Sequence, residues 1–192
     1  MAQEVNYQIM DEEVDEPARG FAREIYEWVE SLCSAGIVLI LVLIFILRVA
    51  TVEGSSMVPT LQPADTLIFS DFGYTPAVGD IIIVDSEGLG KFIVKRVIAT
   101  AGQRVEISEE SGELMVDGKV LNFPGVEDPT LPLEGGMSYP ATVPEDSVFV
   151  LGDNRLHSTD SRSNRVGFVP LQSVYGKVNL RVFPLTQMRL FE

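Results

Sequence analysis

Residues 92–99 read FIVKRVIA, an apolar and β-branched run that is interrupted by two adjacent cations. Such a run is typical of a β-strand, and the alternation of a strand places Ile93, Lys95 and Val97 on one face. Burial of that face would remove the Lys95 ammonium from water and lower its pKa toward neutrality. A neutral amine can act as a general base. The alternative is an edge-strand lysine that protects a sheet against aggregation.

Similar short runs recur along the chain after Glu53, with turn signals between them. The predicted strands lie in TLIFS (66–70), DIIIVDS (80–86), RVEIS (104–108), LMVDGKVL (114–121), SVFVLG (147–152) and YGKVNLRVF (175–183). None of the sequence in this region shows sustained helical periodicity. We therefore predict a mostly β domain over residues 53–192.

The segment that precedes this domain is strongly apolar. Residues 35–47 read AGIVLILVLIFIL, and with their neighbours they reach the roughly 20 residues that cross a bilayer. A core helix would keep a polar face, and a cleaved signal peptide would begin with a short basic region, whereas the flank here is long and acidic. The sequence therefore predicts a retained transmembrane anchor over residues 31–52, in contact with membrane lipid.

The charge pattern limits the possible partners. Residues 1–30 are predicted to form an acidic, loosely ordered tail, with at most one or two amphipathic turns in FAREIYEWVE (21–30). The net charge of −14 argues against a nucleic-acid partner, because phosphate binding needs clustered lysine and arginine. With one cysteine and one histidine, a site of Cys and His ligands is improbable, and we predict neither a metal nor a cofactor.

Two polar segments can carry chemistry together with Lys95. Residues 52–61 read VEGSSMVPTL, where small residues and a proline turn present two adjacent serines, Ser55 and Ser56. Residues 152–162 read GDNRLHSTDSR and offer hydroxyls and paired ions that suit the orientation of a catalytic amine. Taken alone, the first segment is better explained as an ordinary turn, and the alternative for the second is a solvated loop. Local sequence does not separate the two serines.

Three segments, in this order behind an apolar span, resemble the signature boxes of bacterial type I signal peptidases: GSSMVPTL (54–61), FIVKRVI (92–98) and GDNRLHSTDSR (152–162). The resemblance covers nearly the whole chain beyond the acidic tail. It implies a β catalytic core with a small β subdomain inserted at about 102–144, behind one N-terminal transmembrane helix. It also implies a membrane-bound serine endopeptidase that removes signal peptides from secretory preproteins, with small residues such as Ala-x-Ala before the cut.

The same resemblance assigns catalytic roles to individual residues. Ser56, directly before the methionine of its box, corresponds to the nucleophile, and Lys95 corresponds to the general base. Ser158 corresponds to a serine that hydrogen-bonds the base. The backbone N–H of Ser56 corresponds to an oxyanion donor. Some family members have a second hydroxyl donor where this chain has Gly54, so the second donor is open, with Ser55 as a candidate.

The resemblance further implies ion pairs beside the site, Asp160 with Arg162 and Asp153 with Arg96. His157 falls at a variable position and is expected to be dispensable. An extended substrate would add as a strand beside the serine and lysine segments. By position, the predicted apolar lining of the substrate site consists of Val52, Met57, Leu61, Ile93 and Val94.

The resemblance also settles the predicted topology, since the positive-inside bias of the sequence is slight. The N-terminus is expected to be cytoplasmic and the catalytic domain extracytoplasmic. A self-cleaving repressor-type peptidase shares Ser-Lys chemistry, but it should be cytosolic and carry a DNA-binding head. A non-catalytic, membrane-tethered β module that binds exported peptides should lack Ser56 or Lys95, and both are present.

Overall fold

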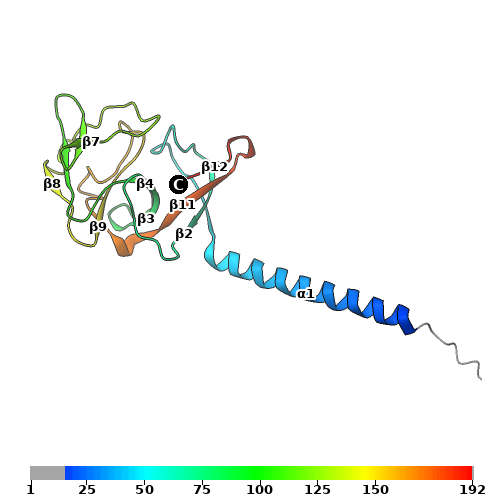
Figure 1. The fold of residues 1–192 in the computed structure, drawn as a ribbon. Helices are drawn as coiled ribbons and strands as arrows, with labels where there is room; N and C mark the ends of the chain where they lie inside the picture. Colours follow the sequence, from blue (N-terminus) through cyan, green and yellow to red (C-terminus); the bar gives the residue numbers. More distant parts are fainter. Residues whose placement is uncertain (1–15, 192) are drawn as a thin grey trace, which may run out of the picture. The chain divides into compact units, whose positions relative to one another are not determined.

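The computed structural model describes residues 16–191 and divides into two compact units, Met1–Phe45 and Ile46–Glu192. The first unit is formed by helix α1 (Glu16–Ile46) (Figure 1). The helix includes residues 16–30, so the prediction of loose order is wrong for this part of the tail. Arg23 and Glu27, one turn apart, form an ion pair at 3.0 Å, and the apolar segment that follows extends the same helix. Residues 1–15 lie outside the described part.

Helix α1 also contains the predicted membrane segment. Residues 23–43 are long and apolar enough to cross a bilayer, and the apolar side chains of residues 37–43 are all exposed. Residues 48–51, which the prediction included in the anchor, form strand β1 instead. All four of them pair with the next strand, because a short β-branched segment gains more from a sheet edge than from a frayed helix end.

The second unit contains two antiparallel sheets. The larger sheet has the order β1-β2-β11-β3-β4-β9-β10, with β12 paired to β11. Its strands are β1 (Arg48–Thr51), β2 (Thr66–Ser70), β3 (Ile81–Ser86), β4 (Lys91–Thr100), β9 (Ser147–Leu151), β10 (Val169–Pro170), β11 (Val174–Phe183) and β12 (Arg189–Leu190). Short 3₁₀ helices follow three of them: η1 (Glu87–Leu89), η2 (Leu171–Ser173) and η3 (Leu185–Gln187).

The smaller sheet has the order β7-β6-β5-β8 and falls within the interval where the inserted subdomain was expected. It consists of β5 (Arg104–Ile107), β6 (Leu114–Val116), β7 (Lys119–Val120) and β8 (Ala141–Thr142). The predicted mostly β fold with one N-terminal apolar helix is therefore confirmed.

Strand β3 lies in the middle of the larger sheet and is buried on both faces. Ile81 and Ile83 pack into one core cluster with Met57 and Leu61. The alternate residues, Ile82 and Val84, pack on the other side in a second cluster. Burial on both faces explains why this strand is an unbroken apolar run instead of an alternating one.

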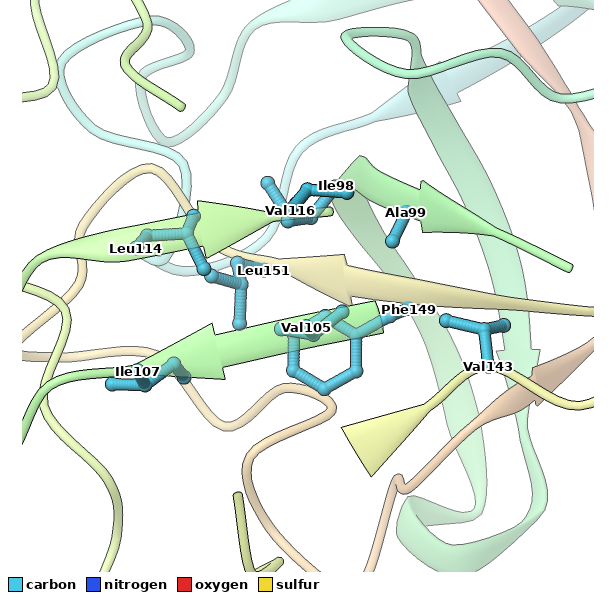
Figure 2. Packing of buried hydrophobic residues seen from close by; sticks show 9 residues of the cluster. All are labelled: Ile98, Ala99, Val105, Ile107, Leu114, Val116, Val143, Phe149 and Leu151. Carbon is cyan, nitrogen blue, oxygen red and sulfur yellow. The ribbon is translucent and has the colours of Figure 1, made fainter. Parts of the chain in front are cut away.

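A third core cluster joins the two sheets (Figure 2). The larger sheet contributes Ile98, Ala99, Phe149 and Leu151, and the smaller sheet and its flank contribute Val105, Ile107, Leu114, Val116 and Val143. The smaller sheet is therefore packed against β4 and β9. These two strands also carry Lys95 and lead into residues 152–162.

Candidate active site

Lys95 lies on β4, between β3 and β9, so it is not on an edge strand and the alternative of a protective edge lysine is wrong. Ile93, Lys95 and Val97 are buried, as the alternation predicts, and Lys95 is 3% exposed. Burial lowers the pKa of Lys95 to about 8 and outweighs the nearby carboxylates of Asp160 and Asp153, which raise it. A large part of the Lys95 population is therefore neutral at mildly alkaline pH.

Ser56 lies in the turn that follows β1. The chain leaves the strand through Gly54, whose φ of +81° favours glycine. The turn is then fixed by Met57 and Leu61, both buried, with the Leu61 N–H donating to the Met57 carbonyl at 2.9 Å. This arrangement leaves the Ser56 side chain half-buried.

The two predicted catalytic groups meet directly. The Nζ of Lys95 lies 2.7 Å from the Oγ of Ser56 and also donates to the carbonyl oxygen of Val94 at 2.9 Å. Ser55, by contrast, is exposed, and its carbonyl oxygen accepts hydrogen bonds from the Val58 N–H and the Asn154 side chain. The geometry thus separates the two adjacent serines, which the local sequence does not.

The chain that leaves β9 contacts the turn that carries Ser56. Leu151 pairs with Arg96, so the next residue, Gly152, arrives beside Lys95. The Asn154 N–H donates to the Ser56 carbonyl at 3.0 Å, and the Asn154 side chain donates to the Ser55 carbonyl at 3.1 Å. The sequence prediction missed Asn154, although its position inside the GDNR box was a signal for it.

Both predicted ion pairs are formed, and both are largely buried. Asp160 and Arg162 are joined by two contacts, at 2.9 and 3.0 Å, and Asp160 also accepts the Gly152 N–H at 3.1 Å. Arg96 forms two contacts with Asp153, at 2.8 and 2.6 Å. Each carboxylate next to Lys95 is therefore neutralised by its own arginine, which limits how far it can stabilise the protonated amine.

Ser158 is 8% exposed, and its hydroxyl has no hydrogen-bond partner among the described residues. The predicted hydrogen bond to Lys95 is therefore not formed in this structure. The hydroxyl nevertheless lies close to the nucleophile's turn, because a side chain on Gly152 would meet both the Ser158 Oγ and the Ser56 carbonyl. The Lys95 amine has a third donor position, which its contacts with Ser56 and Val94 leave free.

A groove of about 750 Å³ opens onto Ser56 and Lys95. Four of the predicted apolar lining residues, Val52, Met57, Ile93 and Val94, lie in its wall. Leu61 does not; it is 0% exposed, because the helical turn from Met57 directs both side chains into the core. The prediction for Leu61 is therefore wrong. Lining residues that the prediction missed include Ala50, Ile83, Leu89, Phe92, Thr159 and Arg165, and His157 also lies there.

The backbone N–H of Ser56 forms no hydrogen bond to any acceptor within residues 16–191. It remains free to bind a substrate oxygen, as an oxyanion donor must. No group of three potential metal ligands occurs among the described His, Cys, Asp and Glu side chains.

Known proteins are similar to this chain in sequence. Residues 25–183 match the family described as signal peptidase, peptidase S26. The chain is 30% identical over 184 residues to a signal peptidase I of Bacillus licheniformis, covering 91% of this chain and 97% of the relative. It is 34% identical over 175 residues to signal peptidase I P of Bacillus subtilis subsp. natto, with 86% and 92% covered.

A crystal structure of a signal peptidase I from Enterococcus faecalis V583 is 32% identical, with a TM-score of 0.43, and the match covers 54% of this chain and 97% of that one. The family match and the relatives define the class as that of signal peptidases. The chain belongs to the signal peptidase family, peptidase S26. The prediction that it is an enzyme of this family is confirmed.

Proposed function

We propose that this protein removes N-terminal signal peptides from secretory preproteins, with Ser56 as nucleophile and Lys95 as general base. The observation that carries this proposal is the 2.7 Å contact between the Lys95 amine and the Ser56 hydroxyl at the groove. Nucleophile and base within hydrogen-bond reach are the geometric requirement for covalent catalysis of acyl transfer. The dyad supplies both groups, so the proposal involves no metal, cofactor or nucleic acid.

The reaction begins with neutral Lys95, a form that its burial makes accessible. The amine accepts the Ser56 proton while Oγ attacks the scissile carbonyl carbon and forms a tetrahedral intermediate. The resulting ammonium then donates this proton to the leaving amine as the peptide C–N bond breaks, which leaves an acyl-enzyme and a neutral lysine. Water attacks the ester, with Lys95 again taking the proton and returning it to Ser56.

The intermediate's oxyanion needs donors that are already oriented. The free Ser56 N–H is one such donor, and its position is held because the Ser56 carbonyl accepts the Asn154 N–H. No side-chain donor exists at Gly54. We propose the Ser55 hydroxyl, which is exposed next to the groove, as the second donor once substrate is bound.

The groove suits an extended peptide with small apolar side chains near the cut. Val52, Met57, Ile93 and Val94 give its wall an apolar surface close to the dyad. A substrate segment that adds as a strand would satisfy its backbone through β-augmentation, while shallow apolar pockets would select small side chains. Secretory preproteins with Ala-x-Ala before the cleaved bond are the proposed substrates.

The membrane anchor limits where the enzyme meets these substrates. Helix α1 carries the apolar stretch at residues 23–43, and confinement of enzyme and preprotein to one membrane raises their effective concentration. We propose that the helix spans the membrane in contact with lipid, with a cytoplasmic N-terminus and an extracytoplasmic catalytic domain.

The proposal is tested by cleavage of a preprotein carrying an Ala-x-Ala site, using the full-length enzyme in detergent or vesicles. Ser56→Ala and Lys95→Ala should each abolish processing. Ser108→Ala, directly after β5, and Lys119→Ala, in β7, are matched changes away from the groove and should retain it. His157→Ala should keep most activity, whereas Ser55→Ala should slow cleavage without abolishing it, because it removes the proposed second oxyanion donor. Wild-type cleavage rates in the Lys95→Ala enzyme would refute the dyad, because no other described amine contacts Ser56.

A further inference from the structure

Arg155 stands apart from the other buried arginines beside the active site. It is 4% exposed, and unlike Arg96 and Arg162 it forms no ion pair with any described carboxylate. Burial lowers the pKa of its guanidinium, because removing the charged form from water is unfavourable. A buried cation without a carboxylate partner calls for an explanation in terms of the hydrogen bonds that it makes.

Arg155 uses those hydrogen bonds to join three segments. Its Nε donates to the Gly152 carbonyl at 3.0 Å, and its NH1 group donates to the Thr130 hydroxyl. Its own carbonyl oxygen accepts a hydrogen bond from Arg162 at 2.7 Å. The guanidinium thus connects residues 152–155, which touch the nucleophile's turn, to a residue of the inserted interval.

Thr130 is in turn fixed to the smaller sheet. It is 2% exposed, and its N–H donates to the Gly112 carbonyl at 2.8 Å. Gly112 lies in the turn between β5 and β6, where Pro129 packs so closely that a side chain on the glycine would overlap it. The segment that carries the Thr130 hydroxyl is therefore packed against the smaller sheet, and this packing fixes the hydroxyl next to Arg155.

The other end of this connection reaches the reacting groups. Gly152 packs against the Ser56 carbonyl, and Asn154 donates to the carbonyls of Ser55 and Ser56. We propose that Arg155 and Thr130 are positioning residues, which hold residues 152–155, and through them Ser56, at the geometry that cleavage requires. This inference rests on the proposed function, and it gives the smaller sheet a role in the reaction.

Loss of the Thr130 hydroxyl should affect catalysis more than substrate binding. The groove residues do not include Thr130 or Arg155, so KM should change little, whereas displacement of Ser56 relative to Lys95 lowers kcat. Small displacements of reacting groups can cost up to about a hundredfold in rate. A looser loop also admits water to Lys95, whose lowered pKa is caused mainly by burial. The pH profile should therefore move to higher pH.

The expected shift of the pH profile can be attributed to the entry of water, because the charges around Lys95 stay unchanged in the test. The charged groups that act on Lys95 are Asp160, Asp153 and Lys91, with Arg96 and Arg162 paired to the two aspartates. Glu53, His157 and Arg165 line the same groove. A neutral substitution at position 130 alters none of these charges.

The experiment measures kcat, KM and the pH profile of full-length Thr130→Val, Thr130→Ser and Thr100→Val on a peptide with an Ala-x-Ala site. Thr100 is the matched control: it lies on β4 like Lys95, but its hydroxyl bonds Gln103 at the strand's far end. We expect Thr130→Val to lose at least about tenfold in kcat with an alkaline-shifted profile. Thr130→Ser, which keeps the hydroxyl, and Thr100→Val should both resemble wild type.

Arg155→Lys provides a second variant, since an ammonium cannot bond Gly152 and Thr130 in the same planar geometry. It should reproduce the kcat loss and the pH shift. A uniform loss of activity at all pH values, together with a lower melting temperature, would show that these residues have a merely structural role and would overturn the proposal. Wild-type kinetics in both Thr130→Val and Arg155→Lys would also overturn it. Failure of wild-type enzyme to cleave would instead refute the proposed function itself.

Discussion

Gly152 lies so close to Ser158 that a methyl group on its Cα would overlap the Ser158 hydroxyl oxygen and, on the same side, the Ser56 carbonyl oxygen. Position 152 is therefore the point at which the chain leaving β9 packs against both the nucleophile's turn and a buried hydroxyl. The requirement for glycine comes from space, because the φ angle of this residue is not positive.

Gly152→Ala should consequently inactivate the enzyme by moving Ser56 away from Lys95. Overpacking of this kind costs about 1–3 kcal/mol of stability, and the loss of cleavage should be roughly a hundredfold or more. Thermal unfolding and single-turnover cleavage measure the two effects separately. The control is Gly118→Ala in the open β6–β7 turn, where φ is +73°: it should cost about 1 kcal/mol and retain activity. Equal activity of both variants would contradict the close packing.

The pH dependence of cleavage should follow the lysine. Because burial lowers the pKa of Lys95 to about 8, kcat/KM should reach half its maximum near that pH and fall about tenfold per unit below it. The neutral amine is the active form, so activity rises with pH. Initial rates on a peptide whose own charge is constant between pH 6 and 10 provide the measurement. A profile with its midpoint near the ordinary lysine value would show that Lys95 is hydrated in solution.

Much of this site could be predicted from the sequence, because its chemistry is carried by local patterns. The alternation in FIVKRVIA correctly predicted that Lys95 is buried, and the resemblance of the three boxes predicted both ion pairs. The prediction that Leu61 lines the substrate site was wrong because Leu61 lies one helical turn after Met57. The sequence of so short a segment does not reveal that periodicity. The anchor prediction was wrong for residues 48–51 because no turn signal separates them from the apolar run, and only their pairing with β2 distinguishes them from the anchor.

The role of Arg155 and Thr130 could not be read from the sequence for a different reason. Thr130 lies in the long Pro- and Gly-rich stretch of the inserted interval, where no periodic pattern reports burial. Its 2% exposure and its contact with Arg155 arise only when residues 25 positions apart in the chain are brought together. Contacts of this kind depend on tertiary packing, which local sequence patterns do not encode.

Ser158→Ala tests whether the buried hydroxyl serves the lysine during the reaction. The hydroxyl has no partner in the described residues, so its removal should leave the melting temperature unchanged or raise it slightly. We expect kcat to fall about tenfold, because we infer that this hydroxyl, which lies beside Gly152, accepts a hydrogen bond from Lys95 during the reaction. Ser161→Ala is the contrasting control, since the Ser161 hydroxyl accepts the Val150 N–H at 3.0 Å. It should lower stability by about 1 kcal/mol and change kcat less.

Asp160→Asn should separate the structural role of the buried ion pair from its electrostatic effect on Lys95. Removal of one partner leaves Arg162, which is 1% exposed, without its carboxylate and should destabilise the protein by about 3–5 kcal/mol. The Asp160 charge is also the largest influence that raises the pKa of Lys95. In the folded fraction, measured at low temperature, the pH profile of cleavage should therefore shift to lower pH. This direction is opposite to the one expected for Thr130→Val, so the two variants distinguish loss of a charge from entry of water. An alkaline shift in Asp160→Asn would mean that disruption of the loop outweighs the electrostatic effect, and it would contradict the assignment of Asp160 as the charge that opposes deprotonation of the lysine.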